Sequence, residues 1–210
     1  MNIANVRGLF MPLFRRKRMR CFVATLNPTP STRILDVGGT VFNWQLIEYT
    51  GQITILNLSV PADTSTFPPN FSFVEGDGTC LQHSDNSFDI AYSNSVIEHL
   101  SSWENQIAFA NEMRRVAKKV WVQTPARWFF VEPHLITPFI HFFPKQCQRY
   151  LLRNFTVWGL ITRPPRARVD RFLDTIRLLS LKEMQVLFPD CIVLKERFLG
   201  FAKSYIALRN

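Results

Sequence analysis

The sequence lacks paired cysteines, internal repeats and long apolar runs. Its four cysteines lie far apart and form no CxxC pair, so neither a zinc knuckle nor a redox dithiol nor a disulfide framework is indicated: Cys21, Cys80, Cys147 and Cys191. No run of about 18 uncharged apolar residues is present, so no segment is expected to span a bilayer. Without repeats or low-complexity tracts, the 210 residues predict one globular domain rather than a solenoid or a disordered chain.

Acidic residues are absent from the first 20 positions, which hold six basic residues: Arg7, Arg15, Arg16, Lys17, Arg18 and Arg20. The formal net charge of the whole chain is +9, and the remaining 190 residues carry 19 basic and 16 acidic groups, a net +3. The basicity therefore belongs to an N-terminal arm, residues 1–30, which weakens any argument from charge to nucleic acid. The arm's apolar stretch is short and precedes its charges, unlike a signal peptide, so we expect a cytoplasmic protein.

Strand-like and helix-like segments alternate along residues 31–210, which predicts an α/β fold with a mostly parallel sheet. Strands are expected at 33–37, 52–58, 71–75, 88–92, 118–124, 191–198 and 202–208, and helices at 42–49, 94–100, 103–117 and 181–188. The last two strands meet at Gly200, which indicates an antiparallel hairpin at one edge of the sheet.

Glycines and polar residues stand where the first four predicted strands end. They are Asp36, Gly38 and Gly39 after the first strand, Asn57 after the second, Asp77 and Gly78 after the third, and Ser93 after the fourth. Ligands of an open parallel sheet bind at the carboxyl ends of its strands, and glycine lets the backbone approach a ligand closely. A tight turn alone would also explain the glycine pair, but four such strand ends together favour a nucleotide-type site.

Three segments, ILDVGGT, EGDGTCL and DNSFDIAYSNSVIEHL, resemble motifs of class I S-adenosylmethionine-dependent methyltransferases of type 11. The resemblance covers residues 31–124 by motif and extends to 210 by strand order. It implies a Rossmann-like seven-stranded sheet and S-adenosylmethionine contacts at Asp36, Gly38, Gly39, Thr40, Asn57, Asp77, Gly78 and Ser93. The chain departs from the family pattern in having two adjacent glycines in its first motif and Asn57 where the family usually presents an acid to the ribose.

A general base would assist methyl transfer to an alcohol or phenol acceptor. His99 is the first candidate, and the alternative is that it caps or packs the short helix after the fourth strand. His134 is a second candidate because it follows the carboxylate of Glu132 closely. Adjacent Glu98 and His99 cannot share a helix face, and no third and fourth ligand has compatible spacing, so no metal is predicted.

Residues 126–168 form an aromatic and basic insertion after the fifth strand, where this fold commonly shapes the acceptor site. We expect a lid there, which either packs its aromatics into its own small core or lies at a membrane headgroup surface. Segments 125–134 and 196–204 are similar to bacterial members met in cell-surface polysaccharide gene neighbourhoods. This resemblance implies a small-molecule, sugar or glycolipid acceptor and peripheral contact with anionic lipid at the inner face of the membrane.

Three rival functions are weighed against this interpretation. A nucleic-acid methyltransferase would carry an Asn/Asp-Pro-Pro-aromatic loop after the fourth strand, where this chain has Ser93, Asn94 and Ser95. A non-catalytic protein that binds S-adenosylmethionine or a nucleotide is compatible with the thinned first motif. A nicotinamide-dependent oxidoreductase shares a glycine turn after the first strand, but the GDG loop and the terminal hairpin argue against it.

Overall fold

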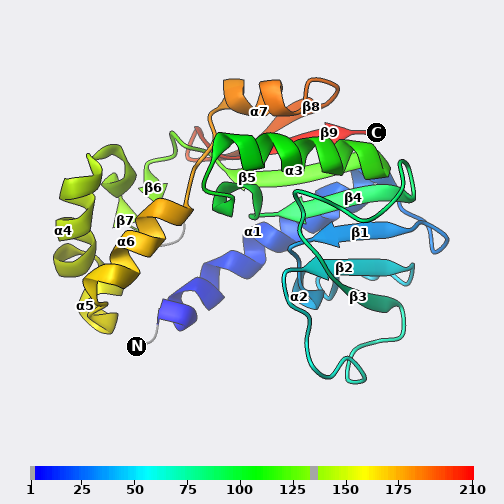
Figure 1. The fold of residues 1–210 in the computed structure, drawn as a ribbon, viewed down its shortest axis with the longest axis horizontal. Coiled ribbons are helices and arrows are strands. Elements are labelled where there is room, and N and C mark those ends of the chain that lie inside the picture. Colours follow the sequence, from blue (N-terminus) through cyan, green and yellow to red (C-terminus); the bar gives the residue numbers. More distant parts are fainter. Residues whose placement is uncertain (1–2, 133–136) are drawn as a thin grey trace.

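The computed structural model describes residues 3–132 and 137–210, which form a seven-stranded sheet in the order β3-β2-β1-β4-β5-β9-β8 (Figure 1). The strands are β1 (Ile34–Val37), β2 (Ile53–Asn57), β3 (Phe71–Glu75), β4 (Phe88–Asn94), β5 (Ala117–Pro125), β8 (Ile192–Phe198) and β9 (Phe201–Arg209). The first five run parallel, whereas β9 pairs antiparallel with both β5 and β8. The predicted fold class, including the C-terminal hairpin, is confirmed.

One face of the sheet is covered by α3 (Trp103–Val116) and, beside it, α7 (Leu181–Leu187) (Figure 1). Phe109, Met113 and Val116 recur at helical spacing on α3 and are fully buried against the strands. The side chain of Ser102 caps the first turn of α3 by accepting a hydrogen bond from the backbone N–H of Asn105, at 3.1 Å.

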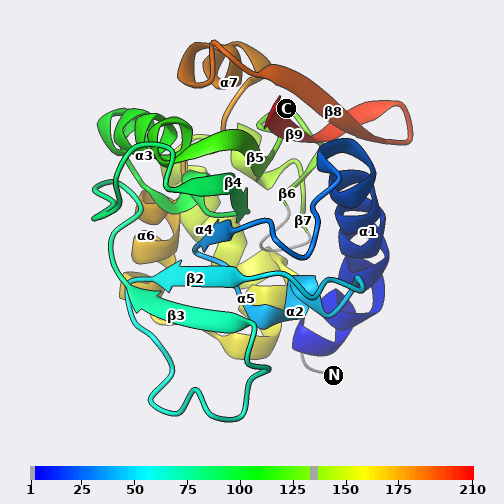
Figure 2. The same ribbon diagram turned by 90° about the vertical axis from the view of Figure 1, so that its right-hand side faces the viewer.

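The opposite face is covered by α1 (Ile3–Leu26), which comes from the basic N-terminal segment (Figure 2). Met19, Phe22 and Leu26 point into the sheet and are fully buried. The ring of Phe22 meets Trp44 and Trp121 edge-on, with centroids 5.7 and 5.5 Å away. Burial of one such aromatic side chain stabilises a fold by roughly 1.5–3 kcal/mol. Residues 14–26 are therefore part of the packed core rather than an appendage to it.

The predicted helix at 42–49 is wrong in its extent, because α2 (Val41–Trp44) ends at Trp44. The indole of Trp44 turns inward and donates to a carboxylate of β1, while the Tyr49 hydroxyl donates to the carbonyl of Thr32 at 2.8 Å. These two hydrogen bonds hold Trp44 and Tyr49 in positions that a continuous helix would not allow, so the helix ends at Trp44. The predicted helical stretch 94–100 is likewise only the 3₁₀ helix η1 (Ile97–His99), since Asn94 belongs to β4 and Ser95 has a φ of 59°.

The insertion after β5, called the lid below, stands beyond one end of the sheet and extends through Thr175, past the predicted residue 168 (Figure 1). Its elements are β6 (Val131–Glu132), β7 (Thr137–Pro138), η2 (Ile140–Phe142), α4 (Lys145–Phe155), α5 (Val157–Thr162) and α6 (Arg166–Thr175). It has a small core of its own, made by the aliphatic residues Ile140, Leu152, Val169 and Leu173. Among the described residues, no helix is both long and apolar enough to cross a membrane.

Candidate active site

The turn after β1 requires both of its glycines. Gly38 has a φ of 73°, and a Cβ there would lie 2.6 Å from a methyl carbon of Val96. A Cβ on Gly39 would lie 1.9 Å from a carboxylate oxygen of Asp36. Contacts below 3.0 Å are not tolerated, so any side chain at either position would push the loop away from the end of β1. The loop is thereby held against the carboxyl ends of β1 and β4.

Asp36 is fully buried beneath this loop. Its Oδ2 accepts a hydrogen bond from the indole Nε1–H of Trp44, at 2.8 Å, whereas Oδ1 is buried without a hydrogen-bond partner in the described part of the chain. Burial raises the pKa of the Asp36 carboxyl to about 7, and the Trp44 hydrogen bond offsets part of this rise. A buried oxygen with unmet hydrogen-bonding capacity fits a cationic donor such as the ammonium group of an amino acid.

Two further predicted residues hold the same loop. The side-chain amide of Asn57, at the end of β2, donates to the carbonyl of Gly39 at 3.0 Å. The hydroxyl of Ser93 is fully buried and donates to the carbonyl of Val37 at 2.9 Å, which ties the ends of β1 and β4 together. Thr40 is exposed in extended backbone immediately before α2. Asn57 and Ser93 thus act directly on the loop's backbone.

Asp77 and Gly78 lie in the next loop, after β3. One carboxylate oxygen of Asp77 accepts from both the backbone N–H and the hydroxyl of Thr79, each at 2.8 Å. A Cβ on Gly78 would lie 2.8 Å from Val37 and 2.9 Å from Phe109, so only glycine lets this loop approach β1 so closely. The structure brings the third predicted strand end against the first.

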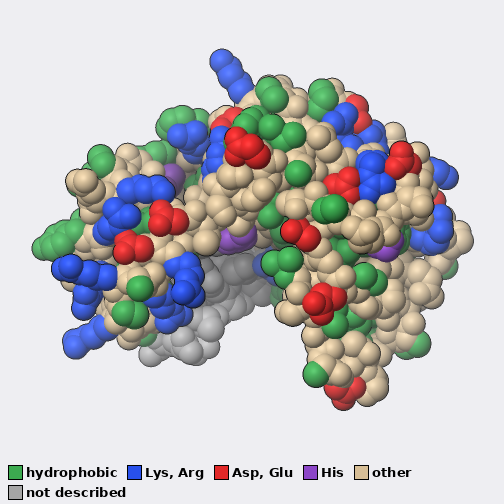
Figure 3. All heavy atoms as spheres, in the orientation of Figure 1, with side chains coloured by type: hydrophobic (Ala, Val, Ile, Leu, Met, Phe, Trp, Pro, Cys, Tyr) green, Lys and Arg blue, Asp and Glu red, His purple; other side chains and the backbone are tan. Residues whose placement is uncertain are grey.

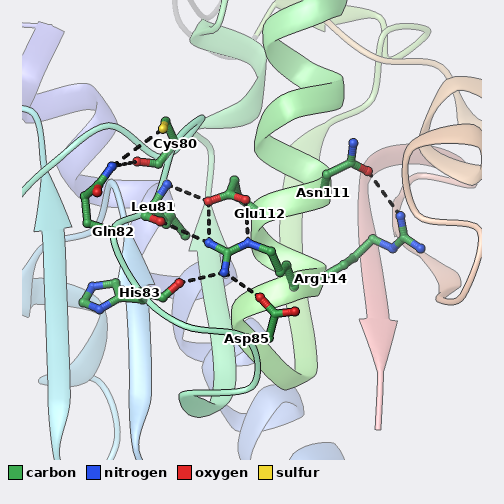
Figure 4. A network of polar contacts seen from close by, with 9 residues as sticks. Cys80, Leu81, Gln82, His83, Asp85, Asn111, Glu112 and Arg114 are labelled. Carbon is green, nitrogen blue, oxygen red and sulfur yellow. Dashed lines mark hydrogen bonds and ion pairs between the residues drawn. The ribbon is translucent and has the colours of Figure 1, made fainter.

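The rest of that loop is fastened to α3 by a polar network (Figure 4). The guanidinium of Arg115 donates to both carboxylate oxygens of Glu112, at 2.7 and 2.8 Å, and to the carbonyl of Leu81 at 3.0 Å. The backbone N–H of Leu81 donates back to Glu112 at 2.6 Å. These hydrogen bonds to Arg115 hold the pKa of the Glu112 carboxyl below its usual range. They restrain the loop that begins at Asp77.

On η1, the side chains of Glu98 and His99 diverge as expected for neighbours on a helix. Glu98 is fully buried and accepts a hydrogen bond from the Thr124 hydroxyl at 2.9 Å, while His99 is exposed. The backbone N–H of His99 donates to the carbonyl of Val96, the residue whose side chain packs on Gly38. His134, the second predicted base, lies outside the described residues.

Another histidine of the insertion, His141, is half-buried on η2. Burial lowers its pKa, and the nearby Glu132 carboxylate partly offsets this effect. Within residues 3–132 and 137–210, no three side chains of the metal-ligating types gather closely enough to hold an ion.

From the sequence, Arg18 was assigned to the basic N-terminal arm, and no role in the core was predicted for it. Arg18 is buried, and its guanidinium donates to the side-chain oxygens of Asn94 and Gln123, at 2.5 and 2.9 Å, near the carboxyl ends of β4 and β5. It also forms a two-pronged ion pair with Glu196 of β8, at 2.9 and 2.6 Å. The i, i+4 series of Arg18, Phe22 and Leu26 was the available signal, since it predicts a helix with a single inward face.

The arrangement of the strand ends agrees with a family comparison, in which residues 35–120 match the model of a methyltransferase domain. The matched segment is about two fifths of the chain and contains Asp36, the two loop glycines, Asn57 and His99. Helix α1, the lid and the C-terminal hairpin lie outside it. A search of curated proteins finds no match.

Solved structures share the fold at low sequence identity. The complex between the Haloferax volcanii Trm112 methyltransferase activator and its methyltransferase matches with a TM-score of 0.55 and 11% identity, over 96% of this chain and 93% of that one. The YcgJ protein from Bacillus subtilis matches with a TM-score of 0.53 and 17% identity, over 86% and 70%. A structure titled as a Zn-dependent alcohol dehydrogenase from Rhodobacter sphaeroides matches with a TM-score of 0.57 and 10% identity, over 91% and 88%.

The chain spans only part of the length of two other solved structures that it matches. The chain covers 46% of the [4+2]-cyclase SpnF and 46% of a sarcosine dimethylglycine methyltransferase from Galdieria sulphuraria, about half of their length. At these identities the solved structures show the fold alone.

Proposed function

We propose that the protein transfers a methyl group from S-adenosylmethionine to a hydroxyl oxygen of a sugar or glycolipid acceptor at the cytoplasmic face of a membrane. The observation that carries the proposal is the buried Asp36 beneath a loop in which both glycines are sterically required. Methyl transfer needs its two partners to be positioned and dehydrated, and the protein need not supply a redox or metal group.

The chain's residues fit the cofactor in the order of the strands. Asp36 would bind the ammonium group from below the loop, and the backbone of Gly38, Gly39 and Thr40 would face the amino-acid tail. Asn57 would meet the ribose hydroxyls while its amide N–H group holds the loop. Asp77 and Gly78 would border the adenine, and Ser93 would keep the ends of β1 and β4 in register. When bound, S-adenosylmethionine supplies an electrophilic methyl carbon on a sulfonium sulfur.

His99 is the proposed general base, and His134 remains the second candidate. His99 would take the hydroxyl proton of the acceptor as its oxygen becomes methylated, and the bound S-adenosylmethionine would supply the methyl carbon and keep the electron pair of the broken bond on its sulfur. General-base assistance of this kind is worth roughly 10²–10⁴-fold in rate. The exposed position of His99, next to the buried Glu98–Thr124 pair, supports this role.

The acceptor class is supported by the surface beside this site. The lid follows directly on the carboxyl end of β5, and Figure 3 shows the surface hollowed between the lid and the sheet-bearing part of the molecule. Exposed rings of the lid include Trp128 and Phe139, and the Arg127 guanidinium lies 5.4 Å from the centroid of the Trp128 ring. Aromatic platforms beside cations suit the ring faces of sugars and the headgroups of lipids.

The test combines calorimetric titration of S-adenosylmethionine with transfer of a labelled methyl group into a glycolipid extract. We expect binding by the wild-type protein, label in an alkali-stable ether, and a loss of transfer of roughly 10²–10⁴-fold in His99→Asn with unchanged cofactor affinity. His83→Asn, on the loop between β3 and β4, is the matched control. Binding without transfer to any extract would favour a non-catalytic binding protein, and absence of binding would overturn the proposal.

A further inference from the structure

The turn between β8 and β9 presents apolar side chains to solvent. Leu199 and Gly200 both have positive φ, 49° and 83°, so they form a tight hairpin turn with Leu199 at its tip. Leu199 is 73% exposed and Phe201 is 58% exposed. A glycine or asparagine would suit the position of Leu199 better, because a leucine rarely adopts a left-handed backbone. The hairpin therefore carries a large apolar residue where the backbone disfavours it.

This turn is continuous with a row of aromatic rings on the lid. The ring centroid of Phe201 lies 5.5 Å from that of Phe130, and Phe130 lies 6.4 Å from Phe139. Phe139 and Trp128 are themselves largely exposed. The apolar surface thus extends from the hairpin across the lid residues that follow β5, rather than being a single exposed side chain.

The same turn lies beside α1, and Figure 2 shows the two on one side of the molecule. The ring of Phe198 meets Phe14 of α1 edge-on, with centroids 5.7 Å apart, and the Lys203 ammonium lies 3.2 Å from the Phe14 ring centroid. Arg16, Lys17 and Arg20 project from α1 into solvent on the side away from the buried Phe22 face. A ridge of cations thus borders the apolar turn.

Positive charge dominates this surface. Within residues 196–204 the one acid is Glu196, which is already engaged by Arg18 and by the Ser204 hydroxyl. Burial, followed by repulsion from Arg18, lowers the pKa of Lys203 to about 8. Arg197 and Lys203 on the hairpin, together with the exposed cations of α1, give this surface a positive charge, and a positive surface attracts anions.

We propose that the β8–β9 turn, the adjoining lid rings and the exposed cations of α1 form one membrane-docking surface that binds an anionic lipid bilayer. Aromatic and leucine side chains beside arginine and lysine are the composition that inserts at the headgroup level. A surface that binds a second copy of the chain would need acidic residues to match these cations. The one acid within residues 196–204, Glu196, is already paired with Arg18. Docking would bring the carboxyl ends of β4 and β5 to the lipid headgroups, an inference that builds on the proposed glycolipid acceptor.

Vesicle sedimentation tests the apolar part. Wild-type protein is expected to sediment with vesicles of phosphatidylcholine mixed with phosphatidylglycerol and not with phosphatidylcholine alone. Leu199→Asn keeps a residue suited to the left-handed turn and should weaken this binding at least several-fold. Val186→Asn on α7 makes the same kind of change at a similarly exposed position, 66%, and should leave binding unchanged. Equal binding by both variants would overturn the proposal.

A variant with three charge-removing substitutions tests the cationic part, the exposed cations of α1. Each cation near an anionic surface strengthens binding by roughly fivefold, so Arg16→Gln, Lys17→Gln and Arg20→Gln combined should weaken it by about 100-fold. The control triple, Arg33→Gln, Lys118→Gln and Lys182→Gln, removes the same charge from other surfaces. Substitution is preferred to deletion of the segment, because Met19 and Phe22 are core residues.

The measurements use neither cofactor nor acceptor, so a failure to bind vesicles is separate from a failure to methylate. Light-scattering measurements of molecular mass on the same variants test the alternative that the surface binds a second copy of the chain. If Leu199→Asn abolishes self-association while the wild-type protein ignores anionic vesicles, the surface binds a second copy of the chain and the membrane proposal is overturned.

Discussion

Asp36→Asn is expected to stabilise the protein in a strongly pH-dependent way. The carboxyl has an ordinary pKa of 3.8, which burial raises to about 7 in the folded state. Between these two values the unfolded chain has lost a proton that the folded chain retains, so stability falls as pH rises through this window. Each pKa unit corresponds to 1.36 kcal/mol, so the full penalty for ionising this group is on the order of 4 kcal/mol, reached above about pH 8.

The amide introduced by this substitution keeps an oxygen for the Trp44 indole and has no charge to bury. Urea unfolding of both proteins across a pH series measures the difference in unfolding free energy. The unfolding free energy of Asp36→Asn should exceed that of the wild-type protein by about 1.4 kcal/mol more for each pH unit between the two pKa values, and the difference should then level off. Asp174→Asn, at an exposed ion pair with Lys145, is the control. A difference that does not change with pH would refute the assignment of a buried, uncompensated carboxylate.

The same variant should bind S-adenosylmethionine far more weakly, since the ammonium group loses its charged partner. In the wild-type protein, binding of a cation beside Asp36 favours the ionised form and should release a proton below about pH 7. Calorimetric titrations in buffers of different ionisation enthalpy measure that release. Proton-neutral binding by the wild-type protein at that pH would place the ammonium group elsewhere.

Two further substitutions test the packing around the site. Phe22→Ala removes a fully buried ring between Trp44 and Trp121 and should lower the unfolding free energy by about 3–5 kcal/mol in urea unfolding, whereas Arg20→Ala on the exposed face should change little. Glu112→Gln should cost about 1 kcal/mol at neutral pH in thermal unfolding. The pKa of the Glu112 carboxyl is lower in the folded protein than in the unfolded chain. The stabilisation by the ionised carboxylate is therefore complete above the unfolded-state pKa and disappears as the pH falls through the folded-state pKa. A loss that persists in acid would contradict the network in Figure 4.

The positions of the strands along the chain and the terminal hairpin were predictable because period-two and buried apolar patterns are local signals. The loop after β1 was predictable for the same reason, since its glycines adjoin a buried strand. The length of α2 was not, because Trp44 ends the helix through a hydrogen bond to Asp36 on a neighbouring element. Local helix propensity contains no information about that partner.

The role of α1 could not be read from composition. Arg18 looks like one cation in a basic run, yet it forms hydrogen bonds with Asn94, Gln123 and Glu196, 76 to 178 residues away in sequence. Buried ion pairs of this kind depend on the tertiary fold, and only the spacing of the neighbouring apolar residues indicates which face of the helix turns inward. The base at position 99 stays a prediction.

The packing of α1 also bears on how the chain folds. The helix packs on Trp44 and Tyr92, which are nearer in sequence. It also packs on Trp121 and on Glu196 of β8. The distant pairings form slowly, because a long loop must close before they contribute. During synthesis, part of the apolar face of α1 can be covered once β4 has been made, whereas the contacts with Trp121 and Glu196 must await β5 and β8. A nascent chain of this protein would thus leave the rest of that face accessible to chaperones over the intervening stretch of translation.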